Sequence, residues 1–242
     1  MTDQSESSFL QQLLRLWHAF GVQTAAVLAL IVFSAALCMA IIYTPRFPAD
    51  EFGALAQKIM YLHIPFAIVS FVAFFFGFVA ALVFQYKDEK TYDDYSRACI
   101  EIGFLYSLAV LVTGPLWARP VWGVWWSFEP RLNTFLIMWC IYAGYFLIPP
   151  FLDGIEVKEQ FRSVMAILGF LMVPVVYYSV DMIAAEFQNH PQRNLEMASS
   201  MVWSIRLVMI SLFLLFLCLS WTRFRIFRLK RKLYRRMIGV LE

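Results

Sequence analysis

Charged side chains are scarce in this chain of 242 residues. Asp, Glu, Lys and Arg together make up 15% of it, whereas soluble domains contain about 25%. Hydrophobic residues make up 61%, and the mean hydropathy is +0.66. So much apolar surface excludes a soluble globular protein and an intrinsically disordered one, and it indicates a chain that is buried in a lipid bilayer.

Motifs of several enzyme classes are missing as well. The four cysteines form no CxxC or CxxCH motif, and the chain contains no glycine-rich phosphate loop and no HExxH. Thiol exchange, covalent attachment of a prosthetic group, nucleotide hydrolysis and zinc proteolysis are therefore unsupported. No cysteine falls in a predicted outer loop, so disulfide bonds are not expected.

Six apolar runs are long enough to cross a bilayer, which takes about 20 residues per helix. They lack the alternation of a barrel strand, and a backbone in hydrocarbon must satisfy its own hydrogen bonds, so all six are predicted to be helices. The chain is therefore predicted to be an all-α integral membrane protein with six transmembrane helices. The predicted spans are residues 24–44, 62–86, 102–117, 133–152, 163–183 and 201–221.

Basic residues are distributed unequally between the two sides that these spans define. Both termini share a side with the predicted loops 87–101 and 153–162, and this side holds 14 of the 20 Lys and Arg residues. Eight of the 14 lie in the tail between Arg223 and Arg236. By the positive-inside rule, both termini are predicted to be cytoplasmic.

A single membrane domain, 1–242, is predicted in three parts. Residues 1–23 form a cytoplasmic amphipathic segment, because apolar residues between Phe9 and Phe20 recur at helical spacing. Residues 24–221 form the six-helix domain, whose first span is expected to remain as an anchor. Residues 222–242 form a basic cytoplasmic tail, which is expected to contact anionic lipid rather than nucleic acid.

Histidine is rare, and two of the three histidines are predicted to face outward from different helices. His63 begins the second span and His190 follows the fifth, whereas His18 lies in the cytoplasmic segment. Two neutral imidazoles on one side of a membrane suit a haem iron or a transition metal. Each histidine alone is also explained by a position beside water. A metal site other than haem would need carboxylates such as Asp50, Glu51 or Asp181.

The segment between the third and fourth spans is rich in tryptophan. Residues 117–131 read WARPVWGVWWSFEPR and contain Trp117, Trp122, Trp125 and Trp126, four of the eight tryptophans in the chain. An aromatic belt explains one or two aromatic residues at the end of a span. A flat apolar ligand that stacks on these rings, with Arg119 or Arg131 reaching its carboxylates, is the alternative to an unusually rich belt.

Three motifs together resemble those of the CcmC family, haem-handling membrane proteins of bacterial cytochrome c maturation. They are YLHIP at 61–65, WGVWWSFEPRL at 122–132 and YSVD at 178–181. Their order and spacing are similar to those of the family over nearly the whole chain. The Trp-rich motif is shared with the wider superfamily, whereas the six-span size resembles CcmC rather than its longer relatives.

The resemblance implies a protein that is not an enzyme and that holds haem b non-covalently at the periplasmic face of the bacterial inner membrane. It implies that His63 and His190 are the axial iron ligands above a platform in the Trp-rich periplasmic loop. It also implies delivery to the haem chaperone CcmE, with CcmA, CcmB and CcmD as further partners. The implied contacts to haem are His63, His190, Trp117, Trp122, Trp125, Trp126, Phe128, Glu129 and Arg131.

The second histidine is displaced relative to the family motif. Counted from Tyr178, it is expected near Phe187, whereas His190 lies three residues later. Three residues are nearly one helical turn, so a slightly longer fifth helix would still direct the ring inward. Because Pro191 disfavours the α conformation in the residue before it, His190 is expected at the end of that helix or in the turn beyond.

Two other classes of function are open. A haem-b subunit of a redox complex also pairs histidines, but it usually buries them within helices and often needs a second haem. A small-solute transporter is expected to contain inverted repeats and broken polar helices, which the sequence does not show. A low-spin bis-histidine absorption spectrum would distinguish haem handling from transport.

Overall fold

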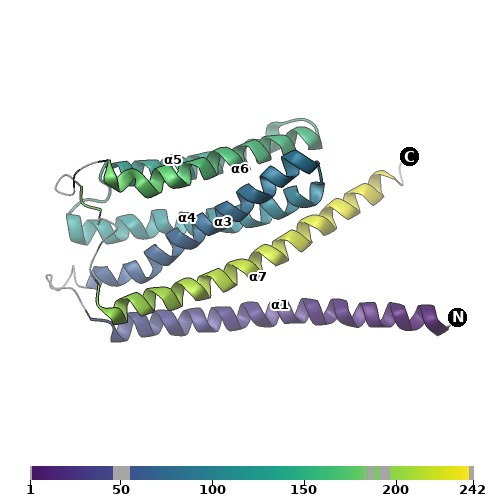
Figure 1. The fold of residues 1–242 in the computed structure, drawn as a ribbon, viewed down its shortest axis with the longest axis horizontal. Helices are drawn as coiled ribbons and strands as arrows, with labels where there is room; N and C mark the ends of the chain where they lie inside the picture. The colour runs from purple at the N-terminus through teal and green to yellow at the C-terminus, as the bar shows by residue number, and fades with distance from the viewer. Residues whose placement is uncertain (1, 46–54, 183, 185–187, 191–196, 240–242) are drawn as a thin grey trace.

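The computed structural model contains six long helices that lie side by side (Figure 1). It describes residues 2–45, 55–182, 184, 188–190 and 197–239, with only the backbone described for residues 2–20 and 238. All six helices are long and apolar enough to cross a membrane, and the described residues contain no strand. The prediction of an all-α membrane protein with six spanning helices is confirmed. The helices are α1 (Thr2–Tyr43), α3 (Met60–Lys87), α4 (Lys90–Trp122), α5 (Pro130–Leu147), α6 (Ile155–Tyr178) and α7 (Ser199–Ile238).

Three short 3₁₀ helices extend the ends of longer ones: Gln57–Ile59 (η1) before α3, Pro149–Phe151 (η2) after α5 and Ser179–Asp181 (η3) after α6. Helices α5 and α6 lie along one edge of the bundle and α1 along the other, with α3, α4 and α7 between them (Figure 1). Both termini lie at one end. The turn between α4 and α5 and the connection from α6 to α7 lie at the opposite end, where the candidate site is found (Figure 1).

Several helices extend beyond the predicted spans. Residues 87–101 were expected to form a loop, but only Asp88 and Glu89 separate α3 from α4, with Asp88 in the left-handed conformation (φ 52°). Helix α6 likewise begins at Ile155, within the predicted loop 153–162. The tail after residue 222 is helical as far as Ile238. Hydropathy did not predict these extended helix ends, because the polar residues in them lie outside the apolar runs.

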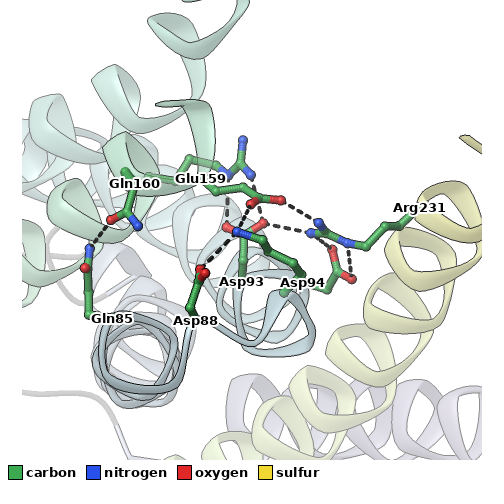
Figure 2. A network of polar contacts seen from close by, with 9 residues as sticks. Gln85, Asp88, Asp93, Asp94, Glu159, Gln160 and Arg231 are labelled. Carbon is green, nitrogen blue, oxygen red and sulfur yellow. Dashed lines mark hydrogen bonds and ion pairs between the residues drawn. The ribbon is translucent and has the colours of Figure 1, made fainter. Parts of the chain in front are cut away.

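Several of those polar residues are buried, and ion pairs join them at the end of the bundle that holds the termini (Figure 2). Asp93 of α4 accepts hydrogen bonds from Nη2 and Nε of Arg162 on α6, at 2.8 and 3.2 Å. Arg231 of α7 pairs with Asp94 at 2.7 Å and also with Asp93 and Glu159. The three carboxylates are only 1 to 2% exposed. These contacts join α4, α6 and α7, and they explain why charged residues lie inside helices here.

The core between this network and the opposite end of the bundle is aromatic. Phe74 of α3 stacks on Tyr142 of α5, with ring centroids 3.8 Å apart and planes 8° apart. A Cβ at Gly169 of α6 would lie 2.6 Å from the ring of Tyr142, so this close approach requires glycine. Such stacking fixes the positions of α3, α5 and α6, which form three walls of the cavity described next.

Candidate functional site

An apolar cavity of about 650 Å³ lies among α3, α4, α5 and α6, toward the end opposite the termini. Its volume is in the range of sites for organic ligands. Phenyl rings from three helices line it, among them those of Phe71, Phe135 and Phe170. Seven of the nine residues proposed from the sequence also line it: His63, Trp117, Trp122, Trp125, Trp126, Arg131 and His190.

Of the four tryptophans in the predicted loop, two lie in a helix and two lie in a turn. Helix α4 continues through Pro120 to Trp122 and ends where Gly123 adopts a φ of 78°. Trp117 and Trp122 are therefore helical, which corrects the expectation of a loop that begins at Trp117. Only residues 123–129 form the turn, and they carry Trp125 and Trp126. Proline at the first position of α5 then starts the next helix, where its missing N–H costs no hydrogen bond.

His63 lies in the first turns of α3 and contacts the neighbouring helix α4. Its Nδ1 atom lies 2.9 Å from Oγ1 of Thr113. The Thr113 hydroxyl donates to the backbone oxygen of Ala109 at 2.8 Å. Because a hydroxyl has one proton, its oxygen is left to accept a hydrogen bond from Nδ1–H of His63. This pattern leaves Nε2 unprotonated, and an unprotonated Nε2 is the form that binds a metal ion.

Two further residues of α4 surround the His63 ring. A Cβ at Gly114 would lie 3.4 Å from Cε1 of His63, so the ring packs directly against the glycine. Trp117 contacts the ring edge to face, with centroids 5.9 Å apart. Thr113, Gly114 and Trp117 thus form one face of α4 that holds the imidazole in place.

His190 lies in the connection between η3 and α7. Helix α6 ends at Tyr178 and η3 ends at Asp181, so His190 does not lie at the end of a longer fifth helix but beyond it, the second of the two predicted positions. The ring instead lies in a bend of the connection, with its centroid 6.4 Å from that of Trp122. The histidine lines the cavity from the side of the α6–α7 connection, whereas His63 lines it from α3.

The carboxylate of Glu129 holds this bend. Its Oε2 accepts a hydrogen bond from the backbone N–H of His190 at 3.0 Å, and its Oε1 accepts two from the backbone and side chain of Asn189, both at 2.9 Å. Burial of the carboxylate raises its pKa, but the donated hydrogen bonds outweigh this effect and hold the pKa of Glu129 below its ordinary value. The residue therefore stays ionised and positions the segment that carries His190.

Two of the proposed contact residues do not line the cavity. Phe128 is 88% exposed, and Glu129 is directed at the backbone of residues 189–190. Of the two arginines considered for ligand carboxylates, Arg131 lines the cavity. Arg119 instead donates to the backbone oxygen of Gly123, at the end of α4.

The alternative metal site can be checked only in part. Among the residues that it describes, no group of three His, Cys, Asp or Glu side chains could hold a metal ion. Asp50 and Glu51 lie outside the described residues. Two imidazoles in a large apolar cavity therefore remain the principal chemical feature of the site.

Sequence reasoning missed the residues that support the two histidines. Thr113 and Gly114 interrupt the apolar third span, and their spacing from Trp117 places all three on one helical face. That spacing was the available signal. Asn189 directly precedes His190, but nothing in the sequence indicated that both would contact Glu129, about 60 residues earlier.

Comparisons of the sequence with known proteins found a family and several relatives. The sequence profile of a family described as CcmC, Heme exporter protein C, matches residues 8–238 of this chain. A Heme exporter protein C from Paracoccus denitrificans is 26% identical over 208 residues, which cover 84% of this chain and 86% of that protein.

Shorter stretches match other relatives. Proteins of the same name from Rhodobacter capsulatus and Escherichia coli K12 are each 29% identical, over 131 and 134 residues. These matches span about half the length of each protein, 54% and 55%. A putative cytochrome c biosynthesis ccmC-like mitochondrial protein from Marchantia polymorpha is 27% identical over 134 residues.

Proposed function

Because this chain belongs to the CcmC family of heme exporter proteins, we propose that it is a haem-trafficking protein of cytochrome c maturation. It binds haem b non-covalently in the cavity between α3, α4, α5 and α6, and it passes the haem to a partner. It acts as a carrier rather than as an enzyme.

One observation carries this proposal. His63 and His190 come from distant parts of the chain, yet both line one apolar cavity. Bis-imidazole ligation of a haem iron needs two neutral imidazoles that reach one site from different walls, together with apolar surroundings for the porphyrin. The cavity supports this proposal, because two imidazoles from separate elements and largely apolar side chains line it.

The other residues at the site have separate roles in this proposal. Trp122, Trp125 and Trp126 offer flat surfaces for stacking, worth about 0.5 to 1.5 kcal/mol per aromatic contact beyond the burial of area. Arg131 lies at the same cavity and is suited to bind a propionate through charge-assisted hydrogen bonds. Glu129 positions His190 rather than touching haem. Phe128, exposed at the tip of the turn, is available to the protein that receives the haem.

The proposed orientation rests on the distribution of basic residues, and the proposed partners rest on the resemblance to the CcmC family. The positive-inside rule places the termini and the ion-pair network in the cytoplasm and the cavity toward the periplasm of a bacterial inner membrane. The recipient of the haem is the periplasmic chaperone CcmE. CcmA and CcmB, an ABC-type pair, and the small protein CcmD complete the assembly.

Transfer to the recipient tests this function. Cells that produce this chain with CcmE should yield both proteins with haem, and the purified chain should show a low-spin bis-histidine spectrum. A Phe128→Ala variant should keep haem on the chain and load CcmE less well. A chain that purifies without colour and never loads CcmE would favour a transporter, and two haems per chain would favour a redox subunit.

A further inference from the structure

Helices α1 and α7 are packed together toward the candidate site and separate toward the termini (Figure 1). Buried alanines mark the packed part of α1: Ala40 is 0% exposed, Ala36 is 8% and Ala29 is 5%. Closer to the termini, a groove of about 620 Å³ is lined by Val22 and Gln23 of α1 and by residues of α7 between Trp221 and Lys232. This groove lies at the opposite end of the molecule from the haem cavity and shares no residue with it.

The terminal part of α7 presents basic residues in two directions. One set pairs with acids of the bundle: Arg223 contacts Glu101 of α4 through two hydrogen bonds of 2.7 and 2.8 Å, and Arg231 contacts the acidic network of α4 and α6. These two cations are accounted for by internal ion pairs.

The other set lines the groove. Arg225, Arg228 and Lys232 recur at spacings of three and four residues, which places them on one face of α7. The described residues that line the groove include no acidic side chain. Val22 of α1 lines its other wall, and Trp221 and Leu229 of α7 add apolar surface beside the three cations. The groove thus combines positive charge with an apolar wall.

The depth of these residues matches the layer of lipid headgroups. Trp203 and Trp221 lie 18 residues apart on α7, or about 27 Å, close to the thickness of the hydrocarbon core. Arg225 is one turn beyond Trp221, about 6 Å farther along the axis. Each headgroup layer is about 5 to 8 Å thick, so Arg225 lies near the level of the phosphates, Arg228 and Lys232 lie on the aqueous side of that level, and Trp221 lies at the edge of the acyl chains.

We propose that this groove binds one anionic phospholipid from the leaflet on the side of the termini. The phosphate lies among Arg225, Arg228 and Lys232, and an acyl chain packs against Val22 and Trp221 between the two helices. Basic pockets between transmembrane helices favour anionic headgroups because each cation near the surface adds attraction. The bound lipid fills the space that opens between α1 and α7.

The test counts lipids that remain on the full-length protein in detergent after phosphatidylglycerol or phosphatidylcholine is added, by native mass spectrometry. Wild type should retain one phosphatidylglycerol and little phosphatidylcholine. The variant Arg225→Gln/Arg228→Gln/Lys232→Gln should retain at least tenfold less phosphatidylglycerol. The control Lys230→Gln/Arg235→Gln/Arg236→Gln removes the same charge outside the groove and should bind as wild type does.

Three results would overturn the proposal. Equal loss in both triple variants would assign the binding to the charge of the tail as a whole. Equal retention of phosphatidylcholine by wild type would leave only an apolar groove, and this comparison requires no variant. Displacement of phosphatidylglycerol by millimolar inorganic phosphate would identify a free anion as the ligand instead. Haem content of each variant reports whether the bundle has folded, since no groove residue lines the haem cavity.

Discussion

The carboxylate of Glu129 accepts a hydrogen bond of 3.0 Å from the backbone N–H of His190, 61 residues later in the chain. It is the last residue of the Trp-rich turn and directly precedes α5, and it therefore joins the tryptophans to the segment that carries one of the proposed iron ligands. One side chain thus links the Trp-rich turn to the segment that carries His190.

The variant Glu129→Gln should lower haem retention by about tenfold. The amide nitrogen that replaces one oxygen cannot accept a hydrogen bond, so a backbone N–H of residue 189 or 190 loses its partner. The haem that remains should show weakened ligation by His190, and added imidazole should restore the bis-imidazole spectrum. Glu156→Gln, the same change at an exposed residue of α6, should have no effect. Unchanged haem content and spectrum in Glu129→Gln would show that this carboxylate does not position His190.

The variant Thr113→Val should weaken haem binding by about 10- to 100-fold, the usual effect of removing a side chain that orients a metal-binding histidine. Valine has no oxygen to accept the proton of Nδ1, so the tautomer and orientation of His63 are no longer fixed. Thr113→Ser keeps the hydroxyl and should retain binding. Haem titration of the purified apoproteins measures the difference, and equal affinity of the Val and Ser variants would contradict this role.

The double variant Trp125→Ala/Trp126→Ala should retain less haem than Trp203→Ala/Trp221→Ala. Only the first pair lines the cavity, and Trp126 also donates a hydrogen bond of 3.3 Å to Asn133 that fixes the turn. The second pair belongs to α7 and tests the effect of losing belt tryptophans. Haem per protein at equal yield is the measurement. Similar losses in both variants would reduce the platform to a membrane anchor.

The variant Arg231→Gln should destabilise the bundle by about 3 to 5 kcal/mol, because it leaves Asp94 and Glu159 buried without their main cation. Thermal unfolding in detergent should show a lower midpoint. Arg236→Gln, on an exposed part of the same helix, should leave the midpoint nearly unchanged. A midpoint for Arg231→Gln equal to that of wild type would show that the network contributes little.

Hydropathy predicted the number and type of the helices because the bilayer requires about 20 apolar residues in each span. It did not predict their ends. Asp93 and Asp94 precede the apolar run of α4, and ion pairs with arginines of α6 and α7 make their burial acceptable. Helical continuity at that end depends on contacts between distant residues, which a local pattern does not contain.

The candidate site was likewise predicted from the sequence only in part. His63 and the tryptophans were found because rare residue types gathered on one predicted side of the membrane. His190 was predicted at the end of a longer helix or in the turn beyond it, and the sequence could not decide between them, since the contact that holds His190 comes from Glu129 rather than from its own neighbours. Phe128 shares the motif of the tryptophans, yet the turn directs it outward.

The most direct test of the account is the absorption spectrum of haem bound to His63→Ala and to His190→Ala, each with and without imidazole. Both variants should lose the low-spin bis-histidine spectrum, and imidazole should restore part of it in each by entering the vacated position. His18→Ala should match wild type. A His190→Ala variant with the wild-type spectrum, beside a His63→Ala variant that has lost it, would contradict the proposed pair of ligands.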